Sequence, residues 1–374
     1  MKLFIPKNGL SFWNLKFKES TYGLDGFLAG SHATEAAQRR VSGAAGRVRF
    51  GKDGGKHWLY NAGLDFTSRA YNINDLGFFR RPNDYGGTAE LRYRENRPGK
   101  IVRARELRGF HHHRWNFDEA LLINNHNFSA GAEWRNYWET SVSFDYNAST
   151  YDDRETRGLG LYRAPGRWST TIDWETDGRA PVIFELTQNY TRDAAGWRQW
   201  QTGLAATVRP TTFAELSAEF THSDSRDREA WVENVSDALI SPNPFSVFGG
   251  RDTRAQDFTL RGNLTFTRDM TLQVYSQLFL AKGHYDRFRR LLSPENSAPY
   301  DYAGDPDFNE SAFNLNVVWR WEYLPGSVLY LVWTQACAGE NRDYFSRWRD
   351  DFNGAFALPA QNVVLLKVSY WWSR

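Results

Sequence analysis

Apolar and polar side chains alternate at every second position through most of this chain, from residue 21 to its end. The clearest run is 313–323, in which one parity carries Phe313, Leu315, Val317, Trp319, Trp321 and Tyr323. The intervening positions are polar except for Val318. This period of two is typical of a β-strand with one apolar face, and no stretch shows a convincing helical period of 3.6. The sequence therefore predicts an all-β protein.

Sixteen such runs predict sixteen strands. They lie near 21–31, 44–51, 57–68, 86–96, 101–112, 119–133, 136–148, 157–175, 181–193, 197–209, 211–223, 255–267, 270–282, 310–323, 326–337 and 361–373. Most have the roughly 9–11 residues that a tilted strand needs to cross a bilayer. The longest, 157–175, contains Ala164-Pro165-Gly166, where it can break into two strands. We expect residues 1–20 to be a periplasmic lead-in or an extra strand, and residues 21–374 to form one domain.

The predicted connections alternate in length along the chain. Tight turns rich in Gly, Pro, Asp and Asn join every other pair of strands, whereas long connections fall at 69–85, 224–254, 283–309 and 338–360. Short turns on one rim and long loops on the other are typical of outer-membrane barrels. We therefore predict a transmembrane, antiparallel, up-and-down β-barrel of about 16 strands in a bacterial outer membrane.

The composition is compatible with that prediction. The mean hydropathy is −0.64, yet 16% of the residues are aromatic, including 16 Trp. A membrane barrel exposes only every second residue to lipid, so its mean hydropathy stays low while aromatic rings gather at the interfaces. The net charge of +2 excludes the electrostatic footprint of a nucleic-acid binder, and the single cysteine, Cys337, excludes an intramolecular disulfide. No apolar run is long enough for a transmembrane helix, and no signal peptide is visible at the N-terminus.

Several stretches resemble one bacterial family of outer-membrane barrels, whose members often carry an N-terminal β-sandwich similar to family-9 carbohydrate-binding modules. The resembling stretches are Asn74–Arg81, Asp269–Gln277, Arg320–Gln335 and Leu365–Trp372. The resemblance implies a barrel of unassigned function and supplies no catalytic residues. We expect the N-terminal sandwich to be absent from this chain.

The parity of the strands assigns charged side chains to the interior of the predicted barrel. One wall is acidic, with Glu133, Glu139, Asp145, Asp173, Glu175, Glu185, Glu215 and Glu219. The opposite wall is basic, with Arg47, Arg49, Arg92, Arg94, Arg103, Arg105, Arg261, Arg320 and Lys367. Two such walls would create a transverse field that orients dipolar solutes. The alternative is that these charges pair between neighbouring strands and merely fill the interior.

Other constellations favour neither a metal site nor catalysis. His111 and His113 share one face of a strand, but no carboxylate pattern completes a metal site, and a polar rim explains them equally well. The pairs Asp173/Glu175 and Glu215/Glu219 could act as acid and base, although coincidental pairs are expected among 44 acidic residues. No nucleophile-elbow or zinc-protease motif occurs. We expect no metal, no cofactor and no enzymatic activity.

The leading functional hypothesis is passive, porin-like passage of small polar solutes, because barrels of 16–18 strands leave an aqueous channel. The alternative is a membrane anchor or assembly partner for a separate periplasmic or surface domain, with the connection 224–254 or 283–309 filling the interior. The expected partners are outer-membrane lipid and the barrel assembly machinery that reads the aromatic C-terminal strand, with a separate periplasmic domain as a further candidate. Nucleic acid is not an expected partner.

Overall fold

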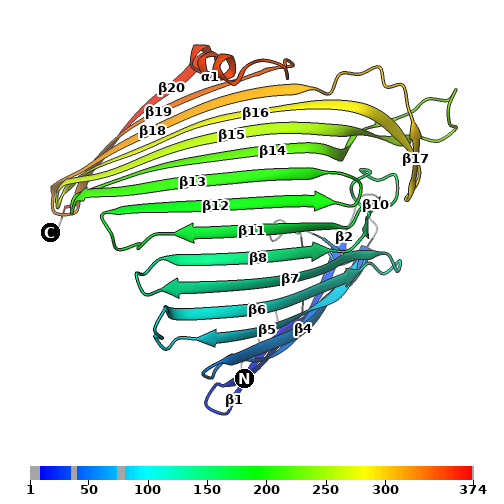
Figure 1. The fold of residues 1–374 in the computed structure, drawn as a ribbon, viewed down its shortest axis with the longest axis horizontal. Helices are drawn as coiled ribbons and strands as arrows, with labels where there is room; N and C mark the ends of the chain where they lie inside the picture. Colours follow the sequence, from blue (N-terminus) through cyan, green and yellow to red (C-terminus); the bar gives the residue numbers. More distant parts are fainter. Residues whose placement is uncertain (1–8, 35–39, 74–80, 373–374) are drawn as a thin grey trace.

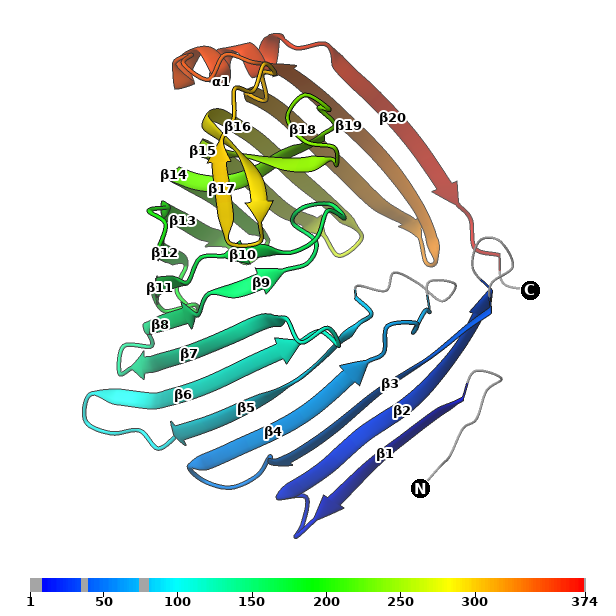
Figure 2. The same ribbon diagram turned by 90° about the vertical axis from the view of Figure 1, so that its right-hand side faces the viewer.

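The computed structural model describes residues 9–34, 40–73 and 81–372, which form a single curled antiparallel sheet with one short hairpin and one helix (Figures 1 and 2). Its elements are β1 (Leu10–Phe17), β2 (Tyr22–Thr34), β3 (Arg40–Lys52), β4 (Trp58–Thr67), β5 (Asp84–Glu95), β6 (Val102–Trp115), β7 (Leu121–Trp134), β8 (Glu139–Asn147), β9 (Thr150–Asp152), β10 (Tyr162–Ala164), β11 (Arg167–Glu175), β12 (Val182–Asp193), β13 (Arg198–Thr211), β14 (Ala214–Val235), β15 (Phe245–Thr267), β16 (Met270–Ser293), β17 (Asn296–Pro299), β18 (Phe308–Leu324), β19 (Ser327–Asn341), α1 (Trp348–Ala357) and β20 (Ala360–Ser369).

Each long strand pairs with the next one along the chain, so the predicted all-β antiparallel meander is confirmed. β17 joins this 18-stranded sheet only through β16, and β9 and β10 form a separate hairpin. Within the described residues, β1 pairs only with β2, and β20 pairs only with β19. The sheet therefore has two free edges and is not closed into a barrel, unlike the prediction. Figure 2 shows it curled into a C with a gap between β20 and the first strands.

The two rims differ as predicted, although several boundaries do not. The connections on one rim have two to six residues, whereas the other rim carries the long connections 148–166, 236–244 and 342–359 together with the short connections 116–120 and 194–197. The predicted loops 224–254 and 283–309 were wrong, because β14, β15 and β16 continue through most of these residues. There apolar and polar side chains no longer alternate regularly, while the backbone ladder continues. Residues 74–80, part of the predicted connection 69–85, lie outside the described residues.

Proline breaks the longest predicted strand as expected, since β10 ends at Ala164 and β11 begins at Arg167. Proline has no N–H to donate to a strand ladder. The first residues of the chain include a real strand, β1. The helix α1 was not predicted, because its ten residues are too few for a helical period to stand out. Among the described residues, no helix is both long and apolar enough to cross a membrane.

Alternation gives the sheet two faces of opposite character. On the outer face, large apolar side chains are more than half exposed, among them Leu28, Leu64, Leu91, Leu107, Phe128, Phe184 and Leu260. This apolar face is the convex one. The helix α1 packs on it, and Figure 2 shows α1 outside the curve of the sheet. The inner face carries most of the charged side chains that pair across strands. A sheet in water normally buries one apolar face, whereas this sheet leaves its apolar face uncovered over most of its width.

Aromatic rings form two belts on the outer face, one near each rim. Near the long connections, the rings of Trp168, Tyr190 and Trp200 touch in series on β11–β13, with centroids 5.3 and 4.4 Å apart. Near the short turns, Trp138 meets Trp174 at 5.2 Å. Trp168 and Trp174 lie on the same strand and face, six residues or about 20 Å apart. Aliphatic side chains and phenylalanine rings fill the band between the two belts.

The helix α1 is held on the outer face by an apolar patch and a polar clamp. Ala355 is fully buried beside Leu278 and Leu280 of β16. At the start of the helix, Lys282 Nζ lies 3.0 Å from Asp351 Oδ2. Burial raises the pKa of the Asp351 carboxyl, but hydrogen bonds from Ser346, Asn309 and Lys282 outweigh it and hold that pKa below its usual range.

The β9–β10 hairpin packs against the extended parts of β14 and β15 at the rim of long connections (Figure 2). The ring of Tyr162 stacks on Phe248 at 4.7 Å, and its hydroxyl donates a hydrogen bond of 2.9 Å to Glu229. Phe248 is only 1% exposed, and Val247 is fully buried. This contact cluster is the most completely buried part of the molecule, and we call it the rim cluster.

We expect Phe248→Ala to release the hairpin from the rim cluster. Removing a fully buried phenylalanine side chain costs about 3–5 kcal/mol, and Phe248 is the ring on which Tyr162 of the hairpin stacks. Trypsin cleavage after Arg154, Arg157 and Arg163 should then be at least about tenfold faster, since cleavage follows the population of the opened form. Leu239→Ala is the control, because Leu239 is 99% exposed on a neighbouring connection. Equal cleavage of Phe248→Ala and the parent protein would contradict this packing.

Candidate functional site

The eight predicted acidic side chains lie on the inner face, and four of them line up across four strands. Strand register pairs Glu133 with Glu139, Glu139 with Glu175, and Glu175 with Glu185. The same rung continues through Ala205 of β13 to Glu219 of β14. Directly opposed residues have Cβ atoms about 5 Å apart. We call Glu133, Glu139, Glu175 and Glu185 the carboxylate row.

The carboxylate row borders a cavity of about 450 Å³, which Glu106, Asp173 and Arg105 also line. Within the described residues, no lysine, arginine or histidine nitrogen lies within 4 Å of the carboxylates of Glu139, Glu175 or Glu185. Like charges directly opposed on a sheet are destabilising. The middle of the row is therefore a concentration of negative charge without a protein counter-ion.

The remaining predicted acidic residues have partners. Glu133, at one end of the row, lies 2.7 Å from Arg103, and Glu215 lies 2.8 Å from Arg209. The oxygens of Asp173 accept hydrogen bonds of 2.9 Å from the hydroxyls of Ser141 and Thr187. Asp145 accepts from Ser143 at 3.3 Å, and Glu219 lies 3.5 Å from Arg261. In the pairs Asp173/Glu175 and Glu215/Glu219, three of the four carboxylates are thus held as hydrogen-bonded or paired anions.

Most of the predicted basic side chains also lie on the inner face, and several are paired. Arg49 binds Asp25 at 3.0 Å and Asp53 at 2.6 Å. Arg92 binds Glu90 at 2.9 Å, and Arg320 binds Glu322 at 2.8 Å. Register places the other basic residues on the same face: Arg47 opposite Asp65, Arg94 opposite Glu106, Arg261 opposite Tyr275, and Lys367 opposite Tyr330.

Arg105 does not lie where the sequence placed it. Register pairs it with Glu95 and Ala132, and its parity is that of the exposed Leu107, so it belongs to the outer face. Arg103 still reaches Glu133, because the ladder is irregular between Val102 and Ala104. The bulge shifts the parity within this strand, and alternation by itself does not reveal a bulge.

The inner face of β6 carries charged residues that were not predicted: Glu106, Arg108 and Arg114. Either parity of residues 101–112 reads as apolar, so only the register with β5 reveals the face. Arg108 binds Glu90 at 2.7 Å. Arg114 binds Asp65 at 2.6 Å and Asp84 at 3.0 Å, and the Arg114 and Asp84 side chains are 14% and 8% exposed.

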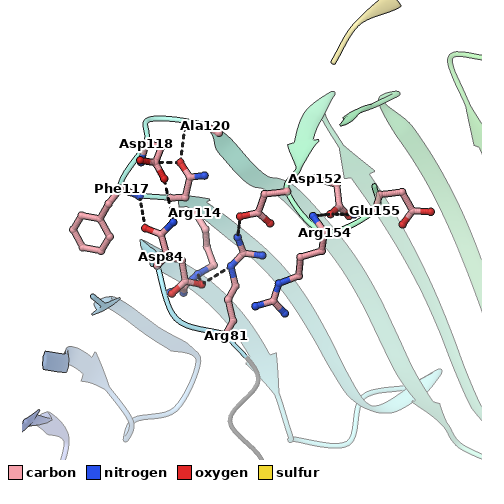
Figure 3. Close-up of polar contacts among 12 residues, drawn as sticks. Arg81, Asp84, Arg114, Phe117, Asp118, Ala120, Asp152, Arg154 and Glu155 are labelled. Atoms are coloured by element: carbon pink, nitrogen blue, oxygen red, sulfur yellow. Dashed lines mark hydrogen bonds and ion pairs between the residues drawn. The ribbon is translucent and has the colours of Figure 1, made fainter. Parts of the chain in front are cut away.

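Figure 3 shows how this pairing extends toward the long connections. Arg81 lies 3.5 Å from Asp84 and 2.5 Å from Asp153, which precedes the β10 strand. The chain of charges Arg114–Asp84–Arg81–Asp153 thus ties the β4–β5 connection to the β8–β11 connection, 72 residues apart. These arginines are structural clamps, because their charges are already compensated.

The two predicted walls therefore differ in how far their charged side chains are paired. On β3–β6, five of the arginines pair with carboxylates of nearby strands and turns, as the alternative interpretation expected: Arg49, Arg92, Arg103, Arg108 and Arg114. On β8–β12, the middle of the carboxylate row has no such partner. The net effect is a local acidic patch on the inner face, which attracts cations and repels anions.

The histidines next to Arg114 do not assemble into a metal centre. His111 Nδ1 donates to the carbonyl of Asn125, and His111 Nε2 accepts from His113 Nδ1 at 3.0 Å. Both nitrogens of His111 are thus used by the protein. His112 points to the opposite face of the strand. The described residues contain no group of three or more His, Cys, Asp or Glu side chains arranged to hold a metal ion.

Comparison with known proteins supplies a family but no activity. Residues 8–372 match the model of the family described as a domain of unknown function, DUF5916. The match covers nearly the whole chain, so this protein belongs to that family. No curated protein matches the sequence.

We expect Arg114→Gln to destabilise the fold, because it leaves the buried Asp84 carboxylate without its main partner. Breaking a buried ion pair costs 3–5 kcal/mol, and we expect about 3 kcal/mol here because Asp65 is one-third exposed. The measurement is the free energy of unfolding in urea. Arg179→Gln is the control, since the Arg179–Asp177 pair lies in an exposed turn and should change stability little. Equal stability of both variants would show that the Arg114 pairs are not structural.

Proposed function

We propose that this protein is an outer-membrane β-barrel that passes small polar solutes and prefers cations. The observation that carries the proposal is the opposite character of the two faces of the sheet. An apolar patch of more than a few hundred square ångströms is rare on a soluble monomer. The exposed leucines and phenylalanines of the outer face extend across nearly every strand. Lipid would cover this face, while the charged inner face would line water.

The aromatic belts support the same placement. Trp and Tyr rings concentrate at membrane–water interfaces, with an apolar band between them. Trp168, Tyr190 and Trp200 would lie at one interface, and Trp138 and Trp174 at the other. On the rung of Trp200, the outer face of the next three strands is charged, at Asp224, Arg254 and Lys282, as expected of strands that leave a bilayer.

In a bilayer the free edges of β1 and β20 would be costly, because hydrocarbon cannot satisfy unpaired backbone groups. We therefore propose that β20 closes onto β2. The strands β2–β8, β11–β16 and β18–β20 number sixteen, so β2 and β20 run antiparallel. With β1 included the number is seventeen, and the seam between β1 and β20 would be parallel. In this proposal β1 leaves the edge of β2 when the barrel closes.

The carboxylate row would set the selectivity of the resulting channel. A sixteen-stranded barrel leaves a water-filled interior. In such a channel, carboxylates without a protein counter-ion raise the local concentration of cations. The arginines of β2–β6 contribute less, because carboxylates already neutralise most of them.

A second function is favoured by the rim cluster, which folds the β9–β10 hairpin against the long-connection rim. In this alternative the interior is obstructed, and the barrel anchors a periplasmic or surface domain, such as the carbohydrate-binding sandwich of the resembling family. Single-channel recording separates the two functions, since an obstructed barrel is electrically silent.

We expect the triple variant Glu139→Gln/Glu175→Gln/Glu185→Gln to lose cation preference. In a planar bilayer with a tenfold KCl gradient, the parent protein should show a reversal potential of the sign that a cation-selective channel gives. The variant should shift it toward zero, because the uncompensated charge is gone. The control is Asp118→Asn/Asp301→Asn/Asp350→Asn, which removes three exposed carboxylates outside the row. An unchanged reversal potential in the row variant would reject the selectivity, and silence of the parent protein would reject the pore.

The proposed closure predicts disulfide formation between β2 and β20. In a Cys337→Ala background, Leu24→Cys should cross-link with Cys placed at Val364, Leu366 or Val368, all on the outer face of β20. A disulfide requires Cβ atoms about 3.5–4.5 Å apart, so it reports direct neighbours. Leu15→Cys, opposite Leu24 on β1, is the matched control. Cross-linking of Leu15→Cys in place of Leu24→Cys, measured in isolated outer membranes, would assign the seam to β1.

A further inference from the structure

A basic pocket and an apolar groove lie next to each other on the outer face, both bordered by α1. The basic pocket has a volume of about 750 Å³ and is lined by residues that include Arg254, Lys282, Arg347 and Arg349. The apolar groove has a volume of about 700 Å³ and is lined by residues that include Phe220, Phe258, Leu278 and Phe352. The pocket belongs to the polar end of the outer face, and the groove belongs to the apolar band.

The two spaces are continuous along three strands and along the helix. On β14, His222 lines the pocket and Phe220 lines the groove; on β15, Gln256 and Phe258 do the same. On β16 the corresponding residues are Leu280 and Leu278. Residues two apart on one face of a strand are separated by about 7 Å. On α1, Trp348 borders the pocket and Phe352, one turn later, borders the groove.

The pocket carries an excess of positive charge. Four cationic side chains face two carboxylates, Asp224 and Asp351, and both carboxylates already have partners. Asp224 is bound by Arg226 at 2.6 Å and by Arg254 at 3.1 Å, and Asp351 is bound by Lys282. Within the described part of the chain, no hydrogen bond or ion pair joins the guanidinium of Arg347 or Arg349 to an acceptor.

Two more features of the pocket suit an anion. His222 Nδ1 is buried and has no hydrogen-bond partner among the described residues. The pocket also opens at the start of α1, where backbone N–H groups and the helix dipole favour negative charge. Arg349 lies over the ring of Trp348, 5.7 Å from its centroid, which orients its guanidinium beside the pocket.

We propose that this joint site binds a membrane lipid with an anionic phosphate headgroup. The phosphate lies in the basic pocket, where Arg347 and Arg349 donate to its oxygens, and an acyl chain lies in the groove beneath α1. The inference rests on the proposed membrane placement, since that placement brings the headgroup level of a bilayer to the pocket and the hydrocarbon to the groove. Charge complementarity selects a phosphate lipid over an uncharged lipid.

The test is native mass spectrometry of the full chain in detergent, titrated with dioleoyl phosphatidic acid. We expect one tightly bound lipid per chain. Arg347→Gln/Arg349→Gln should raise its dissociation constant at least about tenfold, because two charge-assisted hydrogen bonds are lost. Ala218→Phe, which narrows the groove, should have a similar effect. Both changes are at exposed positions and leave the strand ladder intact.

Matched controls define what would overturn the proposal. Arg192→Gln/Arg198→Gln removes two exposed arginines of β12 and β13 on the outer face. Ala89→Phe introduces the same alanine-to-phenylalanine change at an exposed position of β5, which lies outside the groove and far from α1. If these controls weaken binding as much as the site variants, the attraction is diffuse and the site is rejected. Full competition by inorganic phosphate at equal concentration would reject the acyl groove. A stable dimer that excludes the lipid would assign the groove to a second copy of the chain.

Failure of this site and failure of the proposed function remain distinguishable. The titration reads lipid binding in detergent and does not depend on where the chain resides. Fractionation of cells and bilayer recording test the membrane placement and the pore separately. A chain that is absent from the outer membrane would overturn the proposed function, whereas loss of lipid selectivity alone would overturn only the lipid site.

Discussion

The backbone ladder of one continuous antiparallel sheet is the constraint on which everything else depends. Each strand pairs with its neighbour in a defined register, so a side chain's face follows from its position along the strand. The ladder spreads apolar side chains over the whole convex face and charged side chains over the concave one. Among the residues that the structure describes, only α1 covers the apolar face, and it lies over part of β16 and its neighbours. This uncovered apolar surface is the observation on which the proposed lipid environment rests.

Charge pairing divides the inner face into two regions. In one region the charged side chains are paired, and in the other the carboxylates have no protein counter-ion. Arginines of β5 and β6 are tied to carboxylates at distances of 2.6–3.0 Å, and Arg81 extends the pairing to the β8–β11 connection. The middle of the carboxylate row on β8, β11 and β12 is not tied in this way. Repulsion along the row weakens the fold locally, and cations from solution would relieve it. A row of carboxylates that lowers stability and is open to solvent fits the proposed passage of ions better than a structural role.

The helix α1 joins the two levels of the outer face. Its polar start is clamped by Lys282 and Asn309 to the end of the sheet that carries charges, and its aromatic side packs on the apolar band. It therefore lies at the level where the outer face changes from polar to apolar. A lipid headgroup and its chain meet at the same level in a bilayer, so one short helix can border both.

Alternation and turn-forming residues together predicted most of the strands and the antiparallel meander, because both are local properties of the chain, although they missed the extended ends of β14, β15 and β16. Alternation also indicated the faces of the eight acidic residues. It failed to assign the faces of Arg105, Arg108 and Arg114. Their strand, β6, contains a bulge and has apolar residues at both odd and even positions, so the faces become clear only from the register with β5 and β7. The alignment of Glu133, Glu139, Glu175 and Glu185 into one row depends on the stagger of four strands, which no single segment encodes. The free edges of β1 and β20 and the docking of α1 are likewise decided only by contacts between residues far apart in the chain.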